Sequence, residues 1–250
     1  MDIRDTTIDA IILKARDYKE QDKLLTYFAL ESGKGVAIAR GAAKPGGKLR
    51  NIAQPFCRVS LTLSRPKGGV AFVSQGLPQS SFISLGADLS AIVYASYISE
   101  LADTATPEHR PSPGFFALLL TVFSLLQMDD DHARTVRYFE LRLLQELGLL
   151  PDISACADCG RGLLGGSFHL SPKAGGLLCA TCGINDGSPV LCAGAVQTMR
   201  RLLDAPLVRI PSIRISKPIM AEITAALAYY LDYHLEYSSK ARRILQQLLD

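Results

Sequence analysis

Two Cys-x-x-Cys pairs constrain the fold of this chain more than any other feature of its sequence. Cys156 and Cys159 form the first pair, and nineteen residues later Cys179 and Cys182 form the second. This spacing is typical of a four-thiolate zinc site, because each pair makes a tight turn that directs both sulfurs at one ion. A glycine follows each pair and allows the turn to adopt a positive φ. Four thiolates close a tetrahedral site and leave no position for a substrate, so we predict one structural zinc ion.

Other chemistries compete with this interpretation of the cysteines. The pairs could form disulfides, or one could be a redox pair, but the N-terminus shows no secretory-signal pattern and disulfides are rare in the cytosol. His169 lies between the pairs and could replace one cysteine, although a partly exposed loop histidine is the simpler interpretation. We expect the isolated Cys57 and Cys192 to be ordinary small buried residues.

Charge is distributed unevenly along the 250 residues. The formal net charge is +3, but residues 32–87 contain eight basic residues and no Asp or Glu, whereas the remainder carries 19 basic and 24 acidic residues. This segregation favours a polyanionic partner for the first third of the chain.

The size and hydropathy of the chain indicate a globular protein. A hydrophobic content of 48% with 20% charged residues is ordinary, and the length allows two domains. No apolar run approaches the roughly 20 residues of a transmembrane helix, and no signal peptide is evident. We therefore expect a cytoplasmic protein with no membrane partner.

The first third of the chain has the pattern of short β-strands. The predicted strands are residues 8–13, 24–30, 36–39, 57–63 and 70–74. Gly/Pro-rich stretches separate them, and the fourth alternates apolar with polar residues. Five short strands in succession are typical of a small barrel of the OB type.

Helical periodicity replaces the strand pattern after Pro78. The predicted helices are residues 87–104, 115–128, 133–147, 193–203 and a long segment from Pro218 onward. We therefore predict an α+β multidomain protein with an N-terminal OB-fold β-barrel (residues 1–78). An all-α domain (residues 79–150 and 188–250) would follow, with a four-cysteine zinc-binding insertion (residues 151–187).

Basic residues of the barrel segment are candidates for nucleic-acid contacts. They are Lys34, Arg40, Lys44, Lys48, Arg50, Arg65 and Lys67. A barrel would bring their loops together on one face, where Lys and Arg neutralise phosphates without reading sequence. The alternative is a solvated basic surface. Aromatic candidates for base stacking are few, and we expect Phe56 and Phe72 in the core, so backbone contacts should dominate over base contacts.

The sequence does not suggest an enzyme. Residues 41–49 superficially resemble a phosphate-binding loop, but Ala42 occupies the position of its first glycine and Leu49 that of its Ser/Thr. There is no nucleophile elbow or His-Glu-x-x-His motif, and the four histidines suggest no triad.

The predicted helix 133–147 carries a second candidate site. Arg134, Arg137 and Leu141 share one face, separate from the apolar stripe. An exposed arginine pair beside apolar groups can hold a partner's carboxylate while a pocket takes a side chain. The alternative is an ordinary solvated face.

Five short motifs lie in a characteristic order along the chain. They are ESGKG at residues 31–35, ARGA at 39–42, QPF at 54–56, RYFEL at 137–141 and KAR at 240–242. In this order and spacing they resemble the RecO family of bacterial recombination mediators over essentially the full length. The placement of the cysteine pairs after residues 148–151 is similar to that of zinc-bearing members.

The resemblance implies a DNA repair mediator in the cytoplasm, associated with the nucleoid. It implies an OB barrel, a helical domain with a zinc insertion, and ATP-independent binding and annealing of single- and double-stranded DNA. It also implies cooperation with RecR and single-stranded-DNA-binding protein to load RecA, with Arg137 matching the position that takes the binder's acidic, apolar C-terminal tail. Since some members lack the cysteines, the implied role of zinc is stabilisation.

Two other classes of protein are alternatives. An RNA-binding or transcription-associated zinc-ribbon module would bind a folded RNA or a polymerase subunit and would not anneal strands. A metalloenzyme would need an open zinc position, which four bound thiolates exclude.

Overall fold

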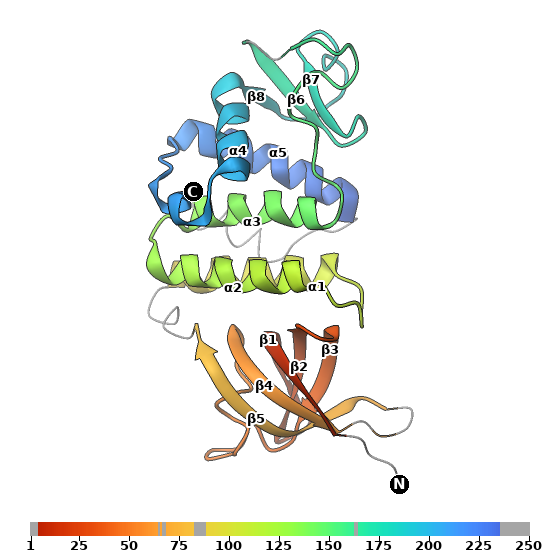
Figure 1. Cartoon of the computed structure of the whole chain (residues 1–250), viewed down its shortest axis with the longest axis vertical. Coiled ribbons are helices and arrows are strands. Elements are labelled where there is room, and N and C mark those ends of the chain that lie inside the picture. Colours follow the sequence, from red (N-terminus) through yellow and green to blue (C-terminus); the bar gives the residue numbers. More distant parts are fainter. Residues whose placement is uncertain (1–4, 65, 67–68, 83–88, 163–164, 236–250) are drawn as a thin grey trace. The chain divides into compact units, whose positions relative to one another are not determined.

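The computed structural model describes residues 5–64, 66, 69–82, 89–162 and 165–235 (Figure 1). Within them the chain forms two compact units, unit one at residues 5–128 and unit two at residues 129–235. Arg65, Lys67 and the KAR motif lie outside the described residues. None of the helices described is both long and apolar enough to cross a membrane.

Five strands of unit one close into a barrel in the order β1-β2-β3-β5-β4. Their bounds are β1 Asp5–Tyr18, β2 Asp22–Ala29, β3 Gly33–Ala39, β4 Cys57–Ser64 and β5 Ala71–Ser81. All neighbours are antiparallel except β3 and β5, which run parallel. Alternate residues of β4 point inward, as its sequence pattern predicts. The predicted OB-type barrel is therefore confirmed.

Strands β1 and β5 extend furthest beyond the residues that the sequence predicts. After a bulge between Ile12 and Lys14, β1 continues to Tyr18 because its polar residues still pair with β2. β5 passes through Pro78, which lies opposite Val59 beside a register shift, a setting in which a strand tolerates proline. Both extensions carry polar or proline residues that hide them from a search for apolar alternation.

The connection between β3 and β4 contributes to the barrel core. Ala42, Ile52 and Ala53 are buried with the inward residues of the strands. Turns make up this connection, and the N–H of Phe56 donates to the carbonyl of Ile12 at 2.8 Å where the connection reaches β4. The loop is thus anchored at both ends and in its middle.

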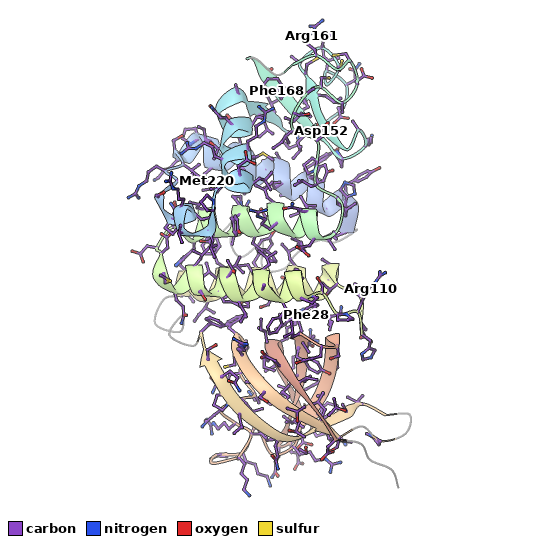
Figure 2. All side chains as sticks on the ribbon, viewed as in Figure 1. Phe28, Arg110, Asp152, Arg161, Phe168 and Met220 are labelled. Atoms are coloured by element: carbon purple, nitrogen blue, oxygen red, sulfur yellow. The ribbon has the colours of Figure 1, made fainter. Side chains whose placement is uncertain are left out.

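Two helices complete unit one and pack against one end of the barrel. α1 spans Leu89–Ala105 and α2 spans Pro113–Met128. The first turn of α2 begins with proline, which suits this position, and the Ser112 hydroxyl accepts the N–H of Phe115 at 3.2 Å. Phe115 meets Phe28 of β2 edge to face, with ring centroids 5.0 Å apart. Figure 2 shows Phe28 at the end of the barrel that faces these helices.

Unit two combines helices with a small sheet. Its elements are α3 His132–Glu146, β6 Ser167–Ser171, β7 Gly176–Cys179, β8 Val190–Cys192, α4 Ala193–Asp204, the 3-10 helix η2 Leu207–Ser212 and α5 Lys217–Leu235. The strands pair antiparallel in the order β7-β6-β8. Gly148 ends the α3 segment with φ +70, as predicted for a helix C-terminus. Sequence periodicity does not reveal the sheet because its strands are only three to five residues long.

Candidate metal centre and nucleic-acid interface

The four predicted metal ligands lie together in unit two. The Sγ atoms of Cys156, Cys159, Cys179 and Cys182 all lie within 4.8 Å of one another, and those of Cys159 and Cys179 are 4.0 Å apart. Sulfurs on a tetrahedral zinc ion are separated by about 3.8 Å, given Zn–S bonds of about 2.3 Å. The cluster could therefore hold a metal ion after a small contraction, and four thiols are a donor set that zinc prefers.

Each pair is folded into a knuckle by a backbone hydrogen bond. The N–H of Gly160 donates to the carbonyl oxygen of Cys156 at 2.9 Å, and that of Gly183 donates to the carbonyl oxygen of Cys179 at 2.8 Å. Gly160 has the predicted positive φ of +68, whereas Gly183 is not among the residues with positive φ. A Cβ at Gly183 would lie 2.4 Å from Cδ2 of His169, so glycine is needed there because a ring packs against the backbone.

His169 lies on a strand and not in a loop, which corrects the sequence-based expectation. It belongs to β6 and is half-buried. Its Nδ1 lies 3.0 Å from the carbonyl oxygen of Ser188, and the cysteine cluster does not include it. The His169 ring therefore packs against the second knuckle, which Cys179 and Cys182 form, and links it to the sheet. Of the two isolated cysteines, Cys57 is buried, but Cys192 is half-buried and caps α4.

Backbone N–H groups favour the thiolate form at the metal centre. Burial raises the pKa of Cys156, but N–H groups of Cys159, Cys179 and Asp158 outweigh burial and lower the pKa to about 6. The N–H of Cys179 lies 3.3 Å from the Cys156 sulfur. These N–H groups favour the thiolate of Cys156, which is the metal-binding form of cysteine. Hydrogen bonds with Asp158 and Cys179 instead raise the pKa of Cys182 in the same cluster.

The loop between β3 and β4 presents a group of exposed cations, here called the basic loop. They are Arg40, Lys44, Lys48 and Arg50. Backbone hydrogen bonds fold the loop on itself, from Lys44 to Gly41 at 3.2 Å and from Gly47 to Lys44 at 3.0 Å. A Cβ at Gly47 would lie 2.2 Å from the Gly41 carbonyl oxygen. The four cations make no ion pair with an acid in the part of the chain that the structure describes.

Lys34 lies apart from the basic loop and is already paired. Its ammonium is 3.4 Å from Oδ1 of Asp103 on α1 and also donates to the Asp103 carbonyl, and its side chain is only 13% exposed. Lys14 shares the same carboxylate at 2.7 Å. Burial raises the pKa of Asp103, but the two lysines lower it overall. The Lys34 charge is thus neutralised inside unit one, which weakens its case as a phosphate contact.

The glycines beside Lys34 explain the ESGKG motif in structural terms. A Cβ at Gly33, where φ is +70, would lie 2.1 Å from the carbonyl oxygen of Arg110. At Gly35 it would lie 2.4 Å from the hydroxyl of Tyr27. The two glycines therefore allow the segment after α1 and the side chain of Tyr27 to pack closely against β3.

The two arginines of α3 are buried, contrary to the prediction of an exposed pair. Arg134 is 1% exposed and bonds Asp129, Asp131 at 2.8 Å and the carbonyl of Ile213 at 3.0 Å. Arg137 is 5% exposed, and its Nε lies 3.0 Å from Oε2 of Glu140. Helical spacing could not show that residues near Ile213 return to cover the start of α3.

Leu141, the third member of that face, is fully buried. It therefore supports the interior of unit two and does not form an apolar slot open to solvent.

One contact of the basic loop has no clear signal in the sequence. The Arg40 Cζ lies 4.0 Å from the ring centroid of Phe72. The sequence predicts Phe72 in the core, yet it is half-buried on β5. The contact arises because β5 pairs in parallel with β3, where Ile38 lies opposite Phe72. This long-range pairing is set by barrel closure.

These features define an OB-barrel protein with a second, mainly helical unit that carries a four-thiol cluster. Two family models match successive parts of the chain, Recombination protein O N terminal over residues 1–82 and Recombination protein O C terminal over residues 86–243. The chain belongs to the RecO family, as the sequence motifs indicate.

Full-length relatives agree with this assignment. A DNA repair protein RecO of Pelotomaculum thermopropionicum is 37% identical over 240 residues, covering 96% of this chain and 93% of the relative. The DNA repair protein RecO of Symbiobacterium thermophilum is 34% identical over 245 residues and 96% of both chains. That of Desulforamulus reducens is 31% identical over 242 residues, 96% of this chain and 94% of the relative.

Proposed function

We propose that this protein is a DNA repair and recombination mediator that binds single- and double-stranded DNA and anneals complementary strands. With RecR it would help to load RecA onto DNA coated by single-stranded-DNA-binding protein, in the cytoplasm at the nucleoid. Its family and the names of its relatives, DNA repair protein RecO, support the repair role. The action is stoichiometric, because it depends on binding strands and not on making or breaking bonds.

The observation that carries DNA binding is the rigid basic loop. Four exposed cations stand on a backbone fixed by hydrogen bonds and by apolar residues inside the barrel. Such cations neutralise phosphates and release counterions whatever the base sequence. Arg65 and Lys67 lie outside the described residues and remain candidates for further phosphate contacts. Lys34, whose charge is paired with Asp103, would support the surface only by stabilising the fold.

The four-thiol cluster would hold one structural Zn²⁺ ion. Cys156, Cys159, Cys179 and Cys182 supply the donor set, and the N–H groups around Cys156 already favour its thiolate. The ion would fix two knuckles that otherwise depend on short backbone bonds.

The acidic, apolar C-terminal tail of the single-strand binder would bind at Arg137. Because Arg137 is only 5% exposed, a terminal carboxylate would have to displace the buried Glu140, whose Oε2 lies 3.0 Å from Nε of the guanidinium. Arg134 and Leu141 would contribute by fixing α3, because Arg134 is held by two aspartates and Leu141 is buried.

An annealing assay on complementary oligonucleotides, with and without pre-bound single-strand binder, tests this function. The triple variant Lys44→Glu/Lys48→Glu/Arg50→Glu should bind weakly, and the slope of log K against log salt should fall by about 0.7 to 0.9 for each phosphate that the protein no longer neutralises. Its matched control reverses three exposed cations of unit two, Arg209→Glu/Arg214→Glu/Lys217→Glu. Equal slopes for both variants would reject the basic loop as the binding surface, and a wild type that anneals nothing would reject the function.

A further inference from the structure

The four cations of the basic loop are not equivalent. Arg40 is exposed, and its guanidinium carbon lies 4.0 Å from the ring centroid of half-buried Phe72. No cation–ring contact of this kind is found for Lys44, Lys48 or Arg50 among the residues that the structure describes.

Both partners of this contact are held by barrel strands. The residue before Arg40, Ala39, pairs with Lys23 of β2. The residue after it, Gly41, has φ +66 and donates its N–H to Oδ1 of Asp22 at 2.8 Å. Phe72 is paired with Ile38 on one side and Ser64 on the other. The guanidinium therefore loses little conformational freedom when it meets a ligand.

We propose that Arg40, held over Phe72, contacts an unpaired base and gives the barrel a preference for single-stranded over duplex DNA. The inference rests on the proposed DNA binding and adds a base contact to it. A guanidinium plane offers a stacking surface for a base, whereas a lysine ammonium is a point charge without such a surface. In a duplex the base faces are covered by neighbouring base pairs, so only the phosphates are available to the loop.

This assignment divides the loop into two chemistries. Lys44, Lys48 and Arg50 would meet phosphates of either DNA form, and Arg40 would add a contact that only a flexible strand can make. The sequence alone predicts that backbone contacts dominate over base contacts, because aromatic candidates are few and its pattern indicates a core position for Phe72. The fold instead places this ring beneath an exposed arginine.

Two variants and two probes test the base contact. Arg40→Lys keeps the charge and removes the plane, and Phe72→Leu removes the ring that holds it. The probes are an oligothymidylate and an abasic oligonucleotide of the same length, at one salt concentration. The ratio of affinities for oligothymidylate over abasic strand should fall about fivefold or more in both variants, since stacking acts per base.

Arg16→Lys provides the matched control, because Arg16 is an exposed arginine of the same barrel on β1. It should leave that ratio as in the wild type, and thermal melting should show that all variants fold. If the ratio is unchanged in Arg40→Lys, the base contact is overturned and phosphate binding stands. If wild-type protein binds neither probe, the proposed DNA-binding function itself fails.

Discussion

Asp103 is the residue on which two lysine charges of unit one converge. Lys14 comes from β1, Lys34 from β3 and Asp103 from α1, so one carboxylate links the barrel to a helix. Its side chain is 26% exposed, so solvent screens this cluster less than a fully exposed pair. Removing the carboxylate leaves two cations close together without a counter-charge.

Asp103→Asn should lower the free energy of unfolding at pH 7 by about 1–3 kcal/mol, the usual cost of losing a charged partner. Because the lysines lower the Asp103 pKa on folding, the carboxylate stabilises the fold above its unfolded pKa and loses this effect as pH falls through the lower folded value. Denaturant titration should therefore show a smaller difference between variant and wild type at strongly acid pH. Asp17→Asn, at a side chain 84% exposed and 4.0 Å from Lys23, is the control; an equal decrease there would contradict the prediction.

The basic loop is the element in which backbone shape and charge depend on each other. Ala42, Ile52 and Ala53 pack into the barrel core and hold the loop in place, so that its cations remain exposed on the surface. Two adjacent glycines have different roles in it. Gly46 has φ +76 with nothing within 4 Å of the position of a Cβ, whereas a Cβ at Gly47 would clash with the Gly41 carbonyl oxygen.

Gly47→Ala should weaken DNA binding although no charge changes. Its methyl group would push the loop apart at the Gly41 carbonyl, moving the cations away from their fixed positions. Gly46→Ala is the matched control, because it meets only a backbone penalty of about 1–2 kcal/mol. Fluorescence anisotropy with a labelled oligonucleotide, together with melting curves, compares them. A larger decrease of affinity in Gly46→Ala would refute the role of the close approach.

The four-thiol segment of unit two makes a different kind of element, one held by its knuckles and a short sheet. Cys159→Ser should release the metal and expose residues 151–187 to protease, since zinc binding contributes about 10–16 kcal/mol in isolated small modules. Elemental analysis and limited proteolysis measure this. Cys57→Ser, a buried cysteine of the barrel, should keep one zinc ion per chain. Full zinc content in Cys159→Ser would contradict a four-thiolate site.

At the scale of the whole molecule, the two units would have separate tasks. Unit one carries the basic loop, and unit two carries the four-thiol cluster and the proposed tail contact on α3. Changes in one unit should therefore alter one activity while sparing the other.

Arg137→Ala should weaken binding of the tail peptide about tenfold or more, as removal of a charge-assisted hydrogen bond implies. The variant should still anneal free strands and should fail on coated ones. Because Arg137 pairs with buried Glu140, the double variant with Glu140→Gln separates the loss of tail binding from the loss of this ion pair. Titration of a labelled tail peptide that gives wild-type affinity for both variants would remove Arg137 from the site.

Local sequence pattern predicts the features that depend on neighbouring residues. The alternation in β4, the glycine after α3 and the spacing of the cysteines each fix a structure within a few residues. The burial of Arg134, the neutralised Lys34 and the Arg40–Phe72 contact each depend on segments distant in sequence. Helical periodicity predicts an exposed face at Arg134. It cannot show that the carbonyl of Ile213, far along the chain, accepts a hydrogen bond from this arginine.

The parallel junction of the barrel also bears on its motions. β3 and β5 meet through Ala37 opposite Ala71 and Ile38 opposite Phe72, a shorter seam than any of the antiparallel junctions. A closed sheet opens most easily where the fewest bonds hold it, so amide hydrogen exchange should be fastest along this seam. A strand of DNA seated on Arg40 would tie the end of β3 to β5 through Phe72. Bound DNA would then slow the local opening of the barrel at this junction.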